Sequence, residues 1–184
     1  MKIIAISGSL RSSSTNTALL YATAALAPKE LDLTIYKGLG DLPHFTPELD
    51  GDTSPRVVRD WRALLENSDG VLIGTPEYAY GIPGVLKNAL DWLVSSGELV
   101  GKSVATISAS PSELGGSKAH ASLILTLTAL AANIVEGGSV TIPFVGKKLN
   151  SNGELIDLNT AQSLKFLLDA LVQGIEAHQK CKII

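Results

Sequence analysis

The feature that most constrains the fold of this chain is a repeated alternation between short apolar runs and longer segments of helical periodicity. Four apolar runs of strand length and the end of a fifth occur at residues 2–7, 31–36, 71–75, 103–108 and 139–142. Strands that alternate with helices form βαβ units, in which the strands run parallel. The chain is therefore predicted to be an α/β protein, with a doubly wound five-stranded parallel sheet in three α/β/α layers.

The intervening segments show one apolar face each, as amphipathic helices do. Residues 15–27 are rich in Ala and Leu, and in the next helix Ser54 is expected to act as cap with Pro55 at the first position. A helix opening at Pro83 is expected to carry its apolar stripe through Val94 and to end at Gly97. Further helices are expected at 116–132 and around 164–175. Residues 37–53 and 143–157 lack periodicity, and the pattern leaves open whether they are lids, dimer contacts or plain surface.

Size and composition restrict the class of protein. A chain of 184 residues without linkers or repeats is expected to form one domain, residues 1–184. Its single cysteine, Cys181, excludes a disulfide framework, and the scattered histidines predict no metal site. With 15 basic and 18 acidic residues and a net charge of −3, the chain lacks the basic stripe that nucleic acids require.

No segment of the sequence predicts export or a membrane span. The apolar start is too short for a signal peptide. The longest apolar tract, residues 119–135, is interrupted by polar residues and falls short of the run of about 20 that crosses a bilayer. The protein is therefore expected to be cytoplasmic.

A polar segment follows the first predicted strand, where the carboxyl edge of a parallel sheet binds ligands. Gly8 and a run of serines lead into a helix that begins near Thr15, and free amides at a helix start form an anion site. The candidate donors are the hydroxyls of Ser9, Ser12, Ser13, Ser14 and Thr15, the amide of Asn16 and the guanidinium of Arg11. Since neither the G-x-x-x-x-G-K-[ST] nor the G-x-G-x-x-G pattern is present, a phosphate monoester is favoured over a nucleoside triphosphate or a dinucleotide. A capped helix start with an exposed arginine is the simpler alternative.

Two more segments follow the third and fourth predicted strands. In the first of them, prolines stiffen a turn with two tyrosines, whose flat faces suit a planar ring. The alternative is a surface loop packed on neighbouring helices. The second segment, residues 108–116, has mostly small side chains, which leave room for such a ring. The candidate residues of the two segments are Pro76, Glu77, Tyr78, Ala79, Tyr80 and Ser110.

These residues resemble a known family, the NAD(P)H-dependent FMN reductases, which are flavodoxin-like proteins that include quinone, azo-dye and chromate reductases. The resemblance is carried by G-S-L-R-x-x-S-x-N from Gly8 and by T-P-E-Y-x-Y-x-I-P-G-x-L-K-N-A-L-D-W-L from Thr75. It runs from residue 2 to about residue 144. Ala79 departs from the pattern, since relatives often carry Asn there.

The resemblance implies non-covalent FMN. Its phosphate positions match Ser9, Arg11, Ser14 and Asn16, with Thr15 and Thr17 adjacent, and the residues around the isoalloxazine are Pro76, Glu77, Tyr78, Ala79, Tyr80 and Ser110. It implies a hydride transfer from NAD(P)H to FMN, followed by electron transfer to a quinone, a free flavin or a similar small acceptor. Because the cofactor carries the chemistry, no catalytic acid or base is assigned. Glu77 is interpreted as a carboxylate that holds backbone or cofactor groups.

Other functions remain open from the sequence. A flavodoxin-like electron carrier or a flavin or nucleotide sensor would bind FMN without nicotinamide turnover, and a non-flavin phosphate-ester enzyme would bind no flavin. Electron carriers of this kind are usually strongly acidic, and a net charge of −3 matches them poorly. The apolar helix at 116–132 has little polar surface, which predicts a homodimer or homotetramer.

Overall fold

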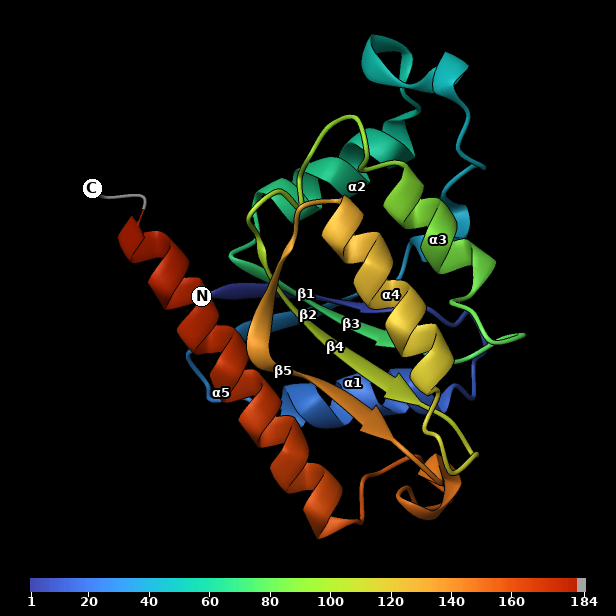
Figure 1. Ribbon diagram of the computed structural model, residues 1–184, viewed down its shortest axis with the longest axis vertical. Helices are drawn as coiled ribbons and strands as arrows, with labels where there is room; N and C mark the ends of the chain where they lie inside the picture. Colours follow the sequence, from blue (N-terminus) through green and yellow to red (C-terminus); the bar gives the residue numbers. More distant parts are fainter. Residues whose placement is uncertain (182–184) are drawn as a thin grey trace.

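A computed structural model describes residues 1–181 and shows a parallel sheet with helices on both faces (Figure 1). The strands pair in the order β2-β1-β3-β4-β5, and every pair is parallel. Their bounds are Lys2–Ser7 for β1, Asp32–Tyr36 for β2, Gly70–Thr75 for β3, Ser103–Ala109 for β4 and Asn133–Ile142 for β5. This confirms the predicted doubly wound five-stranded sheet, with the continuously buried β3 at its centre.

The helices divide between the two faces of the sheet (Figure 1). One face is covered by α1 (Thr15–Leu26) and α5 (Leu158–Cys181). The other is covered by α2 (Arg56–Glu66), α3 (Gly84–Asp91) and α4 (Ser117–Ala129). The result is the three-layer α/β/α arrangement that the sequence predicts.

Alternation along each buried strand builds two separate cores. In β1, Ile4 and Ile6 pack with α2, α3 and α4, whereas Ile3 and Ala5 pack with α1 and α5. All four side chains are at most 1% exposed. Because successive strand residues point to opposite faces, an unbroken apolar run supplies both cores at once.

Three local predictions were wrong. Pro55, not Ser54, occupies the cap position of α2, and the Ser54 hydroxyl donates instead to the carbonyl of Gly51. Helix α3 ends at Asp91, and Val94 lies beyond it with 67% exposure rather than on an apolar stripe. The cause is that residues 92–96 form turns, so they leave the helical register.

The two aperiodic stretches take different forms. Residues 37–53 contain short 3₁₀ turns, which two hydrogen bonds hold in place. The N–H of Phe45 donates to Asn88 Oδ1 at 2.8 Å, and Trp92 Nε1 donates to the Pro43 carbonyl at 2.8 Å. Residues 149–155 form a small antiparallel hairpin. Within residues 1–181, no helix is both long and apolar enough to cross a membrane. The side chain of Cys181 lies outside the described part of the chain.

Candidate functional site

The segment between β1 and α1 forms a serine-rich loop, residues 8–14, whose shape is fixed by its own hydrogen bonds. The Ser14 hydroxyl caps α1 by accepting the N–H of Thr17 at 3.2 Å. The Ser9 hydroxyl accepts the N–H of Arg11 at 3.3 Å, and the Ser7 and Thr17 hydroxyls lie 2.6 Å apart. The loop is therefore organised without a ligand.

The same loop leaves backbone donors open. Within residues 1–181, the N–H groups of Ser12, Ser13, Thr15 and Asn16 donate to no protein acceptor, and the exposed guanidinium of Arg11 forms no ion pair. The N–H groups lie before or in the first turn of α1, where the helix dipole is positive. Such an arrangement favours an anion of the size of a phosphate group.

The side chain of Asn16 lies buried beside the serine-rich loop. Its Nδ2 donates to the carbonyl of Ala109 at 3.1 Å, which ties the start of α1 to the end of β4, and the residue is only 2% exposed. Its Oδ1 is buried without a partner among the described residues. An acceptor oxygen of this kind repels a phosphate group but can accept a hydrogen bond from a hydroxyl group.

Gly8 brings the serine-rich loop against the end of β3. Its N–H donates to the Gly74 carbonyl at 2.7 Å. A Cβ at Gly8 would lie 3.0 Å from Leu86 Cδ2 and 3.3 Å from the Gly74 oxygen. Only a residue without a side chain therefore allows the first and second polar segments to meet this closely.

The segment after β3 forms a tight tyrosine turn, residues 78–81. Tyr78 and Gly81 exchange two backbone hydrogen bonds of 3.0 Å, and Ala79 and Tyr80 have φ values of +49° and +62°. Positive φ at both central residues defines a type I′ turn, which favours Asn and Gly. The side chains of Tyr78 and Tyr80 are 46% and 77% exposed, so the turn presents two aromatic rings at the sheet edge.

Glu77 joins the tyrosine turn to α4. One carboxylate oxygen accepts the N–H groups of Lys118 and Ala119, each at 3.0 Å. The cap position of α4 is Gly116, with φ of +83°, and a Cβ there would lie 2.4 Å from Ser108 Oγ. Since glycine has no capping side chain, Glu77 supplies the cap from another loop, and the interpretation of Glu77 as a carboxylate that holds backbone groups is confirmed.

The segment after β4 carries Ser110 and is supported by the end of β5. The Ser110 N–H donates to the Ile142 carbonyl at 3.3 Å, and its carbonyl accepts the N–H of Val145 at 3.1 Å. Phe144, which precedes Val145 in the sequence, has a left-handed φ of +51°. The sequence did not predict this support, because nothing in residues 142–145 indicates that they form hydrogen bonds to the loop after β4.

The half-buried His120 on α4 belongs to a short chain of polar side chains on β4 and β5. Its Nε2 lies 3.0 Å from the Thr106 hydroxyl, which lies 3.0 Å from that of Ser139. Burial lowers the pKa of the imidazole from its usual value, which favours the neutral ring. No cluster of three or more His, Cys, Asp or Glu side chains suited to a metal occurs among residues 1–181.

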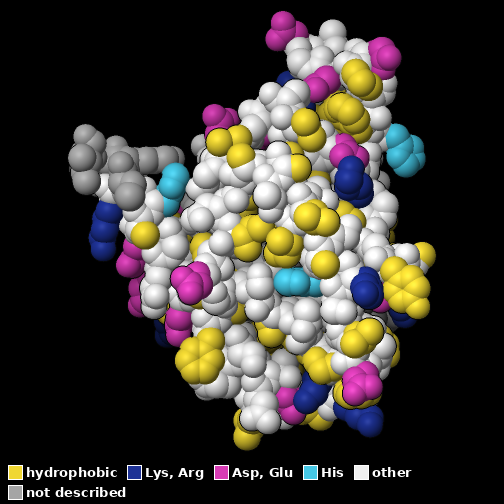
Figure 2. Space-filling view, viewed as in Figure 1, with side chains coloured by type: hydrophobic (Ala, Val, Ile, Leu, Met, Phe, Trp, Pro, Cys, Tyr) yellow, Lys and Arg dark blue, Asp and Glu magenta, His cyan; other side chains and the backbone are white. Residues whose placement is uncertain are grey.

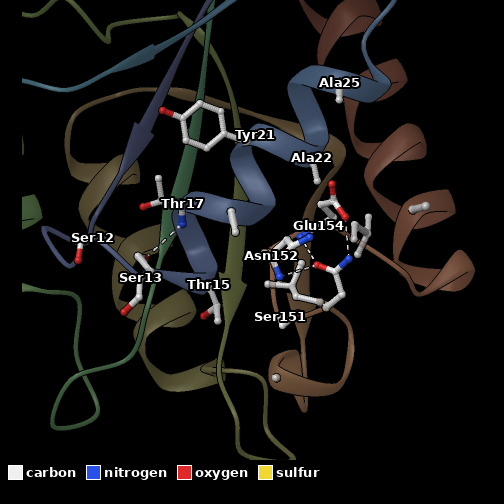
Figure 3. Close-up of a pocket in the computed structure, with 18 of the residues that line it drawn as sticks. Ser12, Ser13, Thr15, Thr17, Tyr21, Ala22, Ala25, Ser151, Asn152 and Glu154 are labelled. Atoms are coloured by element: carbon white, nitrogen blue, oxygen red, sulfur yellow. Dashed lines mark hydrogen bonds between the residues drawn. The ribbon is translucent and has the colours of Figure 1, made fainter.

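A groove also runs along α1 from the serine-rich loop, and its far wall is the hairpin of residues 149–155 (Figure 3). Tyr21 and Ala22 face it from α1. Sequence reasoning did not select these residues. The turn-forming residues Asn150 and Gly153 are the signal that could have predicted the hairpin, although not its position beside α1.

Taken together, the three polar segments meet at the carboxyl edge of the sheet. The contacts Gly8–Gly74, Asn16–Ala109 and Glu77–Lys118 join them in pairs. An open parallel sheet in the order 2-1-3-4-5, with a loop of open N–H donors before its first helix and an aromatic turn beside it, defines a flavodoxin-like protein.

Comparison with known proteins makes the class specific. The chain belongs to the NADPH-dependent FMN reductase family, whose model matches residues 1–147. This confirms the predicted family, fold and class of activity, a flavin-dependent oxidoreductase with a nicotinamide electron donor.

Individual relatives agree with this assignment. The chain is 33% identical over 172 residues to a 2-hydroxy-1,4-benzoquinone reductase of Burkholderia sp., covering 92% of this chain and 93% of the relative. It is 31% identical over 173 residues to an NAD(P)H-dependent FMN reductase of Pseudomonas aeruginosa, covering 93% of each chain. Among solved structures, the flavoenzyme NAD(P)H:(acceptor) oxidoreductase FerB of Paracoccus denitrificans superposes with a TM-score of 0.86 at 32% identity, covering 96% of this chain and 98% of FerB.

Proposed function

We propose that the chain, as a single domain, binds FMN at the carboxyl edge of the sheet, takes electrons from NAD(P)H and passes them to a quinone or a similar small acceptor. In this proposal the phosphate is held by the open N–H groups of Ser12, Ser13, Thr15 and Asn16 and by the Arg11 guanidinium. The hydroxyls of Ser9, Ser14, Thr15 and Thr17 surround it. Asn16 Oδ1 accepts a ribityl hydroxyl. The ring is bordered by Pro76, Glu77, Tyr78, Ala79, Tyr80 and Ser110.

The observation that carries the proposal is that hydrogen-bond donors and one buried acceptor, all unpaired within residues 1–181, lie together at the carboxyl edge of the sheet. Four backbone N–H groups and the Arg11 guanidinium favour a dianion. The buried Oδ1 of Asn16, which lacks a partner among the described residues, favours a hydroxyl nearby. A phosphate ester of a polyol satisfies both, and FMN is such an ester.

Bound FMN supplies two-electron redox chemistry between a reduced nicotinamide and an electron acceptor. The chain supplies placement. The serine-rich loop fixes one end of the cofactor, and the Glu77 bonds to α4 fix the direction in which the tyrosine turn leaves β3. Since the Glu77 carboxylate is occupied by two backbone N–H groups, no general base is assigned to it.

Steady-state kinetics test the two-step reaction. If donor and acceptor use the same exposed position in turn, varied NADPH against varied quinone gives parallel double-reciprocal lines. A sequential pattern with intersecting lines contradicts this scheme.

An FMN-binding electron carrier or sensor is the rival function. The visible spectrum of the purified protein, followed by anaerobic titration with NADPH, separates the two. The oxidoreductase loses its flavin absorbance within the turnover time, whereas a carrier or sensor keeps it. A protein that stays colourless after incubation with excess FMN and desalting contradicts flavin binding itself.

The assembly expected from the sequence is a homodimer or homotetramer in the cytoplasm, with α4 in the interface. The face that carries α4 shows apolar side chains and few charges (Figure 2). Leu125 on α4 is 73% exposed and Val94, which follows α3, is 67% exposed. Burial of such side chains favours a second copy as partner. Light scattering at micromolar concentration tests this, and a monomeric mass contradicts it.

A further inference from the structure

The groove along α1 has a volume of about 900 Å³, within the range of about 300–1,000 Å³ typical of small-molecule sites. It begins at Ser12, Ser13 and Ser14 of the serine-rich loop and continues past Thr17 and Tyr21 (Figure 3). The groove is therefore continuous with the proposed phosphate site, and the two share the same hydroxyl groups.

The far wall of the groove is a well-ordered hairpin. Asn150 Oδ1 accepts the N–H groups of Asn152 and Glu154, each at 2.9 Å, and Asn150 Nδ2 donates to Glu154 Oε2 at 2.7 Å. At its base, the Lys148 ammonium lies 3.1 Å from the Asp157 carboxylate. Hydrogen bonds from Thr160, together with this lysine, lower the pKa of Asp157 to about 2, so the pair stays charged at neutral pH. The concavity is thus built by the hairpin's own bonds.

The lining chemistry suits an uncharged planar group with polar edges. No lysine or arginine lines the described groove, and its one carboxylate, Glu154, is hydrogen-bonded to Asn150. The small apolar side chains of Ala18 and Ala22 line the groove along α1. The Tyr21 side chain is 50% exposed, and within residues 1–181 neither its ring nor its hydroxyl has a partner. An aromatic face of this kind stacks readily on a nucleobase.

We propose that the groove is an adenosine subsite, which allows the chain to bind flavin adenine dinucleotide as well as FMN, with the adenylate half along α1. The inference rests on the proposed FMN site. An uncharged planar group that must lie next to a bound phosphate is most simply a nucleoside joined to it. Linking AMP to FMN spreads the charge over two phosphates without requiring a new cation. Because the chain lacks the glycine pattern that binds a dinucleotide pyrophosphate through backbone N–H groups, the second phosphate depends on hydroxyl donors, and Ser12 and Ser13 line the groove at this point.

Titration of the full-length apoprotein with FMN and with FAD, followed by calorimetry, tests the subsite. The measured quantity is the ratio of the FAD to the FMN dissociation constant. In the parent protein we expect FAD to bind at least as tightly as FMN. Tyr21→Ala removes the stacking surface and Ala22→Trp fills the groove, and each is expected to raise the ratio by about tenfold. Ala177→Trp, at an exposed position of α5 outside the groove, is the matched control and leaves the ratio unchanged.

The outcomes separate the two proposals. FMN binding with an FAD affinity that is at least tenfold weaker, or a ratio that neither groove variant changes, overturns the adenosine subsite and leaves the FMN site intact. Failure of the parent protein to bind either flavin overturns the proposed function itself. A Tyr21→Ala variant with a higher KM for NADPH and an unchanged ratio assigns the groove to the donor nucleotide, which also overturns the inference.

Discussion

The serine-rich loop and the tyrosine turn lie at the same edge of the sheet but are held in opposite ways. The loop is closed by its own hydroxyls, with Ser14 capping α1 and Ser9 bonded to the Arg11 N–H. The tyrosine turn adopts positive φ at two residues that are not glycine, and Glu77 fixes the adjoining segment to α4. One region is preorganised by local bonds, and the other is a strained turn held from a distance.

This difference has a functional meaning. The phosphate of FMN is the same in every turnover, so donors held in fixed positions bind it best. Donors that had to reorganise would bind it more weakly. The tyrosine turn instead depends for its position on the bonds between Glu77 and α4. We therefore expect substitutions in the loop to change mainly FMN affinity, and substitutions around the turn to change stability and turnover.

The largest effect is expected from Arg11→Ala. Loss of a charge-assisted hydrogen bond costs about 2 kcal/mol, so the FMN dissociation constant should rise roughly thirtyfold. Unfolding should change little, since Arg11 is exposed. Fluorescence titration of the apoprotein measures the affinity, with Arg56→Ala on the exposed surface of α2 as control. A change below twofold places the phosphate elsewhere.

The next effect concerns Glu77. Glu77→Ala removes the cap of α4 and should lower the free energy of unfolding by about 1 kcal/mol. Glu77→Gln keeps an acceptor oxygen and should lose less. Urea denaturation measures both, and Glu113→Ala, an exposed acid in the neighbouring segment, should have no effect. Equal losses for alanine and glutamine would show that the charge, rather than the hydrogen bonds, is what α4 requires.

A smaller effect of opposite sign is expected at Ala79. Ala79→Gly relieves the left-handed strain at φ +49° and should raise the free energy of unfolding by about 0.5–1 kcal/mol. The control is Ala63→Gly on the exposed side of α2, which should lower the free energy of unfolding by about 1 kcal/mol. Thermal melts compare the two variants. If Ala79→Gly destabilises the protein, the turn is not strained in solution.

The smallest expected effect is a pH dependence of the free energy of unfolding. It arises from His120 on α4, the helix to which Glu77 fixes the tyrosine turn. Because burial lowers the pKa of His120, the unfolded chain takes up a proton near pH 6.5 before the folded one does. The free energy of unfolding should therefore fall as the pH drops below about 6.5 and level off below the folded pKa. His120→Gln should flatten this slope in melts between pH 7.5 and 5. An unchanged slope assigns it to another group.

Much of the site follows from sequence because its parts are local. The cap at Ser14, the donors at the start of α1 and the turn of Tyr78 and Tyr80 are set by neighbouring residues, and the motifs place them at strand ends. Ser54 and Val94 were misplaced because their positions depend on where a helix starts or ends, which tertiary contacts decide. The bond from the Asn16 amide to the Ala109 carbonyl was not predicted, because the two residues are distant in sequence.

The sequence by itself determined the parallel sheet, since runs buried on both faces and alternating with helices have few other solutions. It also determined which loops lie together, because the carboxyl ends of parallel strands share one edge. Only the tertiary structure decided that Glu77 caps α4, that β5 supports the Ser110 segment and that a hairpin encloses a groove beside α1. These contacts join residues far apart along the chain, and no local pattern encodes a distance between two elements that meet only after folding.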